Sequence, residues 1–164
     1  PGWCSTALKV ANMRSCAAAI LVVLLFCMTL LSQDKPQPQP TPAAFDAQVA
    51  SHLLLQLSES LQGQSQKHFL ELFDLSRMKD GALFRQQVSS FFSKTISIRV
   101  HMNLADTSVD GDKATLAVDA QMEAEPAAGG AFTRRNERLS FAVAQVGDKW
   151  KFVEVHPRSF FSLE

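Results

Sequence analysis

An uninterrupted apolar run occupies residues 17–31 (AAAILVVLLFCMTLL), and the basic residues Lys9 and Arg14 precede it. A basic region followed by an apolar stretch of this length is typical of a secretory signal. The run falls short of the roughly 20 residues that a membrane-spanning helix needs, and small residues do not mark a good cleavage site after it. Residues 1–32 are therefore interpreted as either a cleaved signal peptide or a single uncleaved membrane anchor. Lipid attachment at Cys27 is a less favoured alternative. In each case the basic residues predict that the rest of the chain is exported.

Alternating prolines follow in residues 33–42 (QDKPQPQPTP). Proline at every second position blocks both helix and sheet, and it favours an extended, semi-rigid spacer. We interpret this segment as a tether for residues 43–164, in preference to a proline-rich ligand for another protein.

Helical periodicity begins after the tether. Thr41 and Pro42 have the residue types of a helix N-cap and first turn, and apolar residues then recur every fourth position from Phe45 to Leu61. Gly63 is the expected end of this helix. A short helix is predicted over residues 67–75. A third, capped by Asp80, carries an apolar set made of Leu83, Phe84, Val88, Phe91 and Phe92.

The hydrophobic period changes to two after Lys94. Apolar and polar residues alternate over 96–104, with Ile96, Ile98 and Val100 in the apolar phase, and again over 114–122. Further strands are predicted over 132–146 and 150–155, joined by a Gly147-Asp148 hairpin turn. Helices followed by hairpin-linked strands predict an α+β fold, with the helices packed on one face of a curved antiparallel sheet.

Charge and cysteine content narrow the classes of partner. Residues 43–164 hold 13 Lys and Arg against 15 Asp and Glu, so no basic footprint for nucleic acid is expected. All three cysteines lie within the first 27 residues, and the four histidines lack the spacing of metal ligands. The sequence predicts neither a metal site nor a cofactor.

The closing stretch RLSFAVAQVGDKWKFVEVHPRSFF, residues 138–161, has two strands joined by a Gly-Asp turn, with a tryptophan opening the second. With the preceding order of helices, it resembles the nuclear transport factor 2-like superfamily, a cone-shaped α+β fold, over residues 45–161. The resemblance implies a cavity between the helices and the concave face of the sheet. The superfamily includes isomerases, dehydratases, cyclases, ligand binders and scaffolds, so the fold does not select an activity.

The alternation of side chains between the two faces of each strand identifies the candidate acid–base residues. Arg135 and Glu137 share the phase of the apolar residues in their strand, and Glu154 and His156 share the phase of the apolar residues in theirs. With His52 of the first helix, a carboxylate and an imidazole at the cavity mouth could transfer protons. The ordinary alternative is solvated or ion-paired residues at strand ends, and a one-residue bulge would turn the candidates to the other face.

Aromatic residues are the candidates for an apolar ligand cavity inside the cone. Side chains at helical and strand spacing more often form a packed core. The predicted lining is Phe69, Phe73, Phe84, Phe91, Phe141, Trp150 and Phe152.

The function favoured by these patterns is an exported, membrane-tethered domain that binds a partner protein or a small apolar ligand without catalysis. One alternative is a small cofactor-free lyase or isomerase that uses the acid–base residues named above. Another is a scaffold subunit of a cell-envelope assembly, with a homodimer formed through the exposed sheet face. The expected location is the bacterial periplasm or cell envelope, and residues 1–32, where they stay uncleaved, would anchor the chain in the inner membrane.

Overall fold

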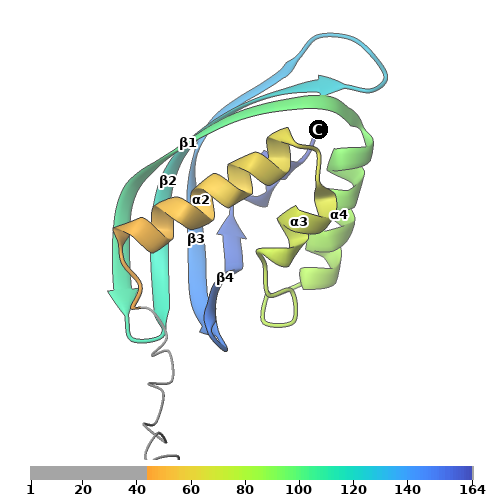
Figure 1. Ribbon diagram of the computed structural model, residues 1–164. Coiled ribbons are helices and arrows are strands. Elements are labelled where there is room, and N and C mark those ends of the chain that lie inside the picture. Colours follow the sequence, from red (N-terminus) through yellow and green to blue (C-terminus); the bar gives the residue numbers. More distant parts are fainter. Residues whose placement is uncertain (1–43, 164) are drawn as a thin grey trace, which may run out of the picture. The chain divides into compact units, whose positions relative to one another are not determined.

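The computed structural model describes residues 44–163 (Figure 1). The predicted signal or anchor and the predicted tether lie outside the described residues. Along the chain the elements are α2 (Ala47–Gln62), α3 (Gln66–Glu71), α4 (Gly81–Ser93), β1 (Thr95–Asp110), β2 (Lys113–Pro126), β3 (Thr133–Val146), β4 (Lys149–His156) and a 3-10 turn, η1 (Arg158–Phe161). No helix within residues 44–163 has both the length and the hydrophobicity needed to cross a membrane.

The four strands form one antiparallel sheet in the order β1-β2-β3-β4, so each strand pairs with its neighbour in sequence. The sheet curves around α2, which lies across its concave face, while α3 and α4 stand toward one end (Figure 1). The predicted α+β fold, with helices on one face of a curved antiparallel sheet, is confirmed.

Helix α2 starts later than the sequence predicted. Its N-cap is Asp46, whose carboxylate accepts a hydrogen bond of 2.8 Å from the backbone N–H of Val49. The predicted start at Thr41 and Pro42 is therefore wrong. The reason is tertiary: Phe45 is buried edge-on against the ring of Trp150, with ring centroids 4.8 Å apart, and the helix begins only after this anchor. The predicted stop is confirmed, because Gly63 is the C-cap residue.

Helix α4 begins where the backbone passes very close to a neighbouring segment. A Cβ atom at Gly81 would lie 2.1 Å from the carbonyl oxygen of Leu75, so only glycine fits there. Asp80 is the N-cap residue, as predicted, but its side chain makes no capping hydrogen bond. Leu83, predicted on the apolar face, is 64% exposed, because Phe84 and Val88 define a buried face that does not include it.

Strand β1 contains a register shift at its first residues. The pairing with β2 passes from Thr95 to Ser97 and leaves Ile96 without a partner. Ile96 is consequently 58% exposed, so its predicted place in the apolar phase is wrong. Thr95 is buried instead, and its hydroxyl donates a 2.9 Å hydrogen bond to the carbonyl of Phe91 at the end of α4.

Candidate functional site

The space between the helices and the sheet, where the resemblance implies a cavity, is occupied by phenylalanine side chains. Six of the seven residues predicted to line a ligand cavity are at most 3% exposed: Phe69, Phe73, Phe84, Phe91, Phe141 and Phe152. Their rings contact one another, with centroids 4.9 Å apart for Phe141–Phe152 and 5.1 Å for Phe69–Phe73. The seventh, Trp150, is half-buried at the surface. The structure thus gathers the six as a packed core, and their role in ligand binding stays a prediction.

Two further rings enter this core from the turn η1. Phe160 and Phe161 are both fully buried, and Phe161 lies 5.3 Å from the ring of Phe69 and 6.2 Å from that of Phe84. Neither residue was predicted from the sequence to belong to the core. Two adjacent apolar residues after the last predicted strand carry no helical or strand periodicity, so pattern alone could not place them.

A bulge in β4 changes the orientation of two candidate acid–base residues. Ala142 of β3 pairs with Glu154, but the next residue, Val143, pairs with Phe152, so Val153 has no partner. Beyond the bulge Val155 is the buried residue, while Glu154 and His156 lie in the opposite phase. Their predicted inward phase is wrong for this reason.

The contacts of Glu154 indicate a structural role. Its carboxylate accepts a 2.5 Å hydrogen bond from the Arg158 guanidinium. The same guanidinium donates a 2.6 Å hydrogen bond to the backbone carbonyl of Lys79. Burial raises the pKa of Glu154, but the hydrogen bond from Arg158 outweighs this and holds the pKa below its usual range. His156 lies 3.6 Å from the same carboxylate and is 67% exposed. A carboxylate that stays ionised at neutral pH ties η1 to the sheet, whereas a general acid needs a raised pKa.

Arg135 and Glu137 keep the phase that the sequence predicted. Their partners across the sheet, Met122 and Ala120, are buried, so both side chains lie on the concave face. The Arg135 and Glu137 side chains are 14% and 28% exposed, and their charged groups are 3.6 Å apart. Arg135 also donates a 3.4 Å hydrogen bond to the hydroxyl of Ser162. The Glu137 carboxylate therefore has a fixed cation beside it.

The structure does not bring the four candidate acid–base residues together. Glu137 belongs to a pair with Arg135, Glu154 and His156 lie in the opposite phase, and His52 lies on α2 beside a surface groove. Within the part of the chain that the structure describes, no three His, Cys, Asp or Glu side chains are grouped to hold a metal ion.

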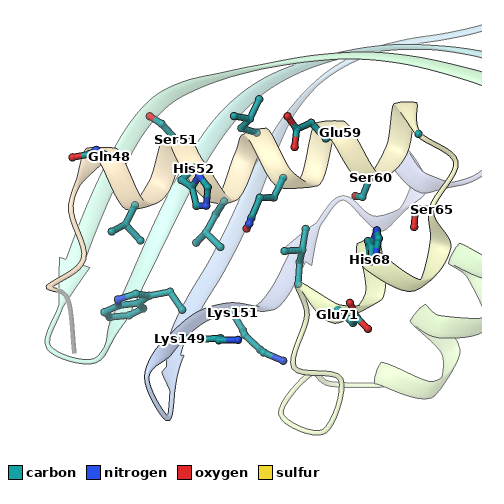
Figure 2. Close-up of a pocket in the computed structure, with 17 residues that line it drawn as sticks. Gln48, Ser51, His52, Glu59, Ser60, Ser65, His68, Glu71, Lys149 and Lys151 are labelled. Atoms are coloured by element: carbon teal, nitrogen blue, oxygen red, sulfur yellow. The ribbon is translucent and has the colours of Figure 1, made fainter. Parts of the chain in front are cut away.

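The surface groove runs between α2, α3 and the first half of β4 and has a volume of about 1450 Å³ (Figure 2). Apolar side chains in its lining are Val49, Leu53, Leu55, Leu72 and Trp150. Polar and charged side chains come from all three elements: His52, Gln56 and Glu59 from α2, His68 and Glu71 from α3, and Lys149 and Lys151 from β4.

Local structure explains how these residues meet. His52, Gln56 and Glu59 are four and three residues apart, so they share one side of α2 next to its buried stripe. The segment after α3 is held against β4 by two backbone hydrogen bonds, in which Phe152 N–H donates to Leu72 at 2.9 Å and Asp74 N–H donates to Phe152 at 2.8 Å. The lining residues come from distant parts of the sequence, so no motif could reveal the groove.

The outer face of the sheet carries three ion pairs among the described residues. Arg138 binds Asp119 through two hydrogen bonds of 2.8 and 3.1 Å and lowers the pKa of that carboxyl. Glu123 lies between Arg134 at 2.8 Å and Arg99 at 3.7 Å. A homodimer through this face stays a prediction, and it would have to accommodate these charges.

Comparison with solved structures gives the fold. A nuclear transport factor 2-like superfamily protein from Salmonella enterica serovar Typhimurium is 17% identical with a TM-score of 0.57, covering 66% of this chain and 87% of that one. A provisionally named scytalone dehydratase from Novosphingobium aromaticivorans has a TM-score of 0.60 at 10% identity, covering 66% and 79%. A provisionally named aromatic ring hydroxylase from that organism has a TM-score of 0.57 at 19% identity, covering 66% and 84%. The domain therefore has the nuclear transport factor 2-like fold that the resemblance implied. No protein-family model matches the chain, and no curated protein matches it either.

Proposed function

We propose that this domain, carried on an exported and membrane-tethered chain, binds a segment of a partner protein in the groove between α2, α3 and β4, without catalysis. The observation that carries the proposal is the contrast between a phenylalanine-packed interior and a large hollow on the surface. Binding at the groove requires no opening of the core.

The dimensions of the groove favour a chain segment over a small molecule. Small-molecule sites usually measure about 300–1,000 Å³ and enclose most of the ligand, whereas this groove of about 1450 Å³ lies open along α2. The 16 residues of α2 span roughly 24 Å, which is enough to hold an extended peptide. Apolar side chains with a polar surround are also the usual composition of a protein–protein contact.

The lyase or isomerase alternative has weaker support. Glu154 is held ionised by Arg158, Glu137 lies beside Arg135, and His52 is on another surface. The solved structures that are named as enzymes share the fold at 19% identity or less, and fold alone does not carry activity. The envelope scaffold differs from our proposal mainly in its contact surface, and the ion pairs on the outer sheet face favour the groove.

Selection of binding peptides tests the proposal. The purified full chain is panned against a random peptide library, and the selected peptides are measured on a chain in which Gln56→Trp fills the groove. The matched control is Gln86→Trp, because Gln86 is an exposed glutamine of α4 that does not line the groove. Binding should weaken by roughly tenfold or more with Gln56→Trp and stay unchanged with the control. Peptides that bind both variants equally would contradict the proposal.

Export is tested separately. Residues 1–45 are fused to a reporter enzyme that is active only outside the cytoplasm. An active reporter is expected, and Lys9→Glu/Arg14→Glu should reduce its activity, because basic residues before the apolar run direct its orientation. A silent reporter would refute export without affecting the groove.

A further inference from the structure

Lys151 differs from the other cations of the described domain. Among residues 44–163, three lysine or arginine residues are half-buried and the rest are exposed. Arg135 and Arg158 have carboxylates at 3.6 and 2.5 Å. Lys151, the third, has no carboxylate within 4.0 Å in this part of the chain and lines the groove. Its side chain is partly buried, and no carboxylate of the described residues lies beside its ammonium group.

Lys149 accompanies it on the same strand. Both side chains line the groove, and Figure 2 shows them extending in the same direction from β4. Lys149 also lacks a carboxylate partner among the described residues. Of the two acidic residues that line the groove, Glu71 lies 3.9 Å from Lys67 of α3, and Glu59 has no cation partner in the described domain. The β4 side of the groove therefore carries two positively charged lysines that have no carboxylate partner among the described residues.

A carboxylate that approaches an ammonium group with no other partner forms a charge-assisted hydrogen bond with it. Trp150 stands between the two lysines in sequence, so its side chain leaves the strand on the opposite face, and with Leu72 it gives the groove its apolar surface near β4. An acidic side chain next to an apolar one would satisfy both features at once.

We infer that the groove takes an acidic protein segment, whose Asp or Glu carboxylates lie against Lys149 and Lys151 and whose apolar side chain packs on Trp150 and Leu72. This inference rests on the proposed function, because it names the chemistry of the partner segment. Charge complementarity between the basic β4 side and the segment carries it.

The same panning tests the inference with charge-reversed chains. Peptides selected on the natural chain should be enriched in Asp and Glu next to an apolar residue. Lys149→Glu/Lys151→Glu should weaken their binding by roughly tenfold or more and should itself select peptides with Lys or Arg. The matched control is Lys94→Glu/Lys113→Glu, because both of these lysines are exposed and lie outside the groove. It should leave binding unchanged.

A second variant distinguishes the loss of positive charge from misfolding caused by charge reversal. Lys149→Gln/Lys151→Gln removes the charges without reversing them, and circular dichroism checks that it remains folded. Binding of the acidic peptides to this variant should be weaker than to the natural chain and stronger than to the charge-reversed chain. Added salt should weaken their binding to the natural chain but hardly affect their binding to this variant.

The two proposals fail in different ways. Some peptides could lose their binding to the Gln56→Trp chain, yet be no richer in Asp and Glu and bind the lysine variants as tightly as the natural chain. That result would overturn the acidic-segment inference and leave groove binding intact. Peptides that are insensitive to Gln56→Trp would overturn groove binding itself.

Discussion

Replacing Phe161 with alanine tests whether the interior of the domain is filled. Phe161 is fully buried, and the rings of Phe69, Phe84 and Phe160 surround it at 5.3, 6.2 and 5.2 Å. The substitution removes a phenyl ring from the region where the fold would otherwise leave a hollow. If the region is closely packed, neighbouring rings cannot move far enough to fill the gap.

The expected cost follows from this packing. A Phe→Ala change in a packed core lowers the free energy of unfolding by about 3–5 kcal/mol. Aromatic pairs add roughly 0.5–1.5 kcal/mol each beyond the buried area, so we expect the upper part of that range. For a domain of roughly 120 residues, the whole range of about 3–5 kcal/mol corresponds to a fall of about 12–20 °C in the melting temperature.

Urea unfolding followed by circular dichroism measures the effect. The matched control is Phe132→Ala, because Phe132 is 46% exposed, and it should cost less than about 1 kcal/mol. The Phe161→Ala domain should also bind benzene, since an apolar cavity stays dry and accepts such ligands. A cost for Phe161→Ala as small as that of the control, or benzene binding inside the natural domain, would refute the filled interior.

Three other changes test the local structure. Gly81→Ala should destabilise the domain by roughly 1–3 kcal/mol, because its Cβ would meet the carbonyl of Leu75; an unchanged thermal midpoint would contradict the close approach. Asp46→Ala should cost about 1 kcal/mol through loss of the N-cap, whereas Asp46→Asn should cost little in the same urea titration. Glu154→Gln should lower the stability at neutral pH, because Arg158 holds the folded-state pKa of Glu154 below its unfolded value. A depressed pKa stabilises the fold above the unfolded value and ceases to do so as the pH falls through the folded one. The difference from the natural chain should therefore shrink below about pH 4.5, and a difference that persists into strong acid would exclude this cause.

Periodicity predicted the order and type of the elements because each element buries one face against the same core. The β1–β4 hairpins follow the alternation of apolar and polar residues closely. The errors fall where a single residue breaks the alternation. Ile96 and Val153 are both skipped in the pairing, and neither residue type indicates a bulge in the sequence. A prediction of which face of the sheet a side chain occupies therefore fails where it is carried across either residue.

The candidate site was harder to predict than the fold for a related reason. Local signals named single residues, whereas the groove depends on hydrogen bonds that hold the segment after α3 against β4. The same limit explains the helix start: Thr41 and Pro42 have only the residue types of a local cap, whereas the contact between Phe45 and Trp150 sets the position of the chain. Tertiary contacts of this kind leave no short-range pattern.

The bulge in β4 has a consequence for how this strand tolerates insertion and deletion. Phe152 and Val155 are both buried, with two residues between them where a regular strand would have one. Deleting Val153 would leave Phe152 and Val155 on the core side and Glu154 and His156 on the other. The strand thus carries one supernumerary residue, and loss of a single codon would shorten it without exchanging its faces. A second residue inserted beside Val153 would put three residues between Phe152 and Val155, and the alternation of a regular strand would again keep both on the core side, with Glu154 and His156 on the other.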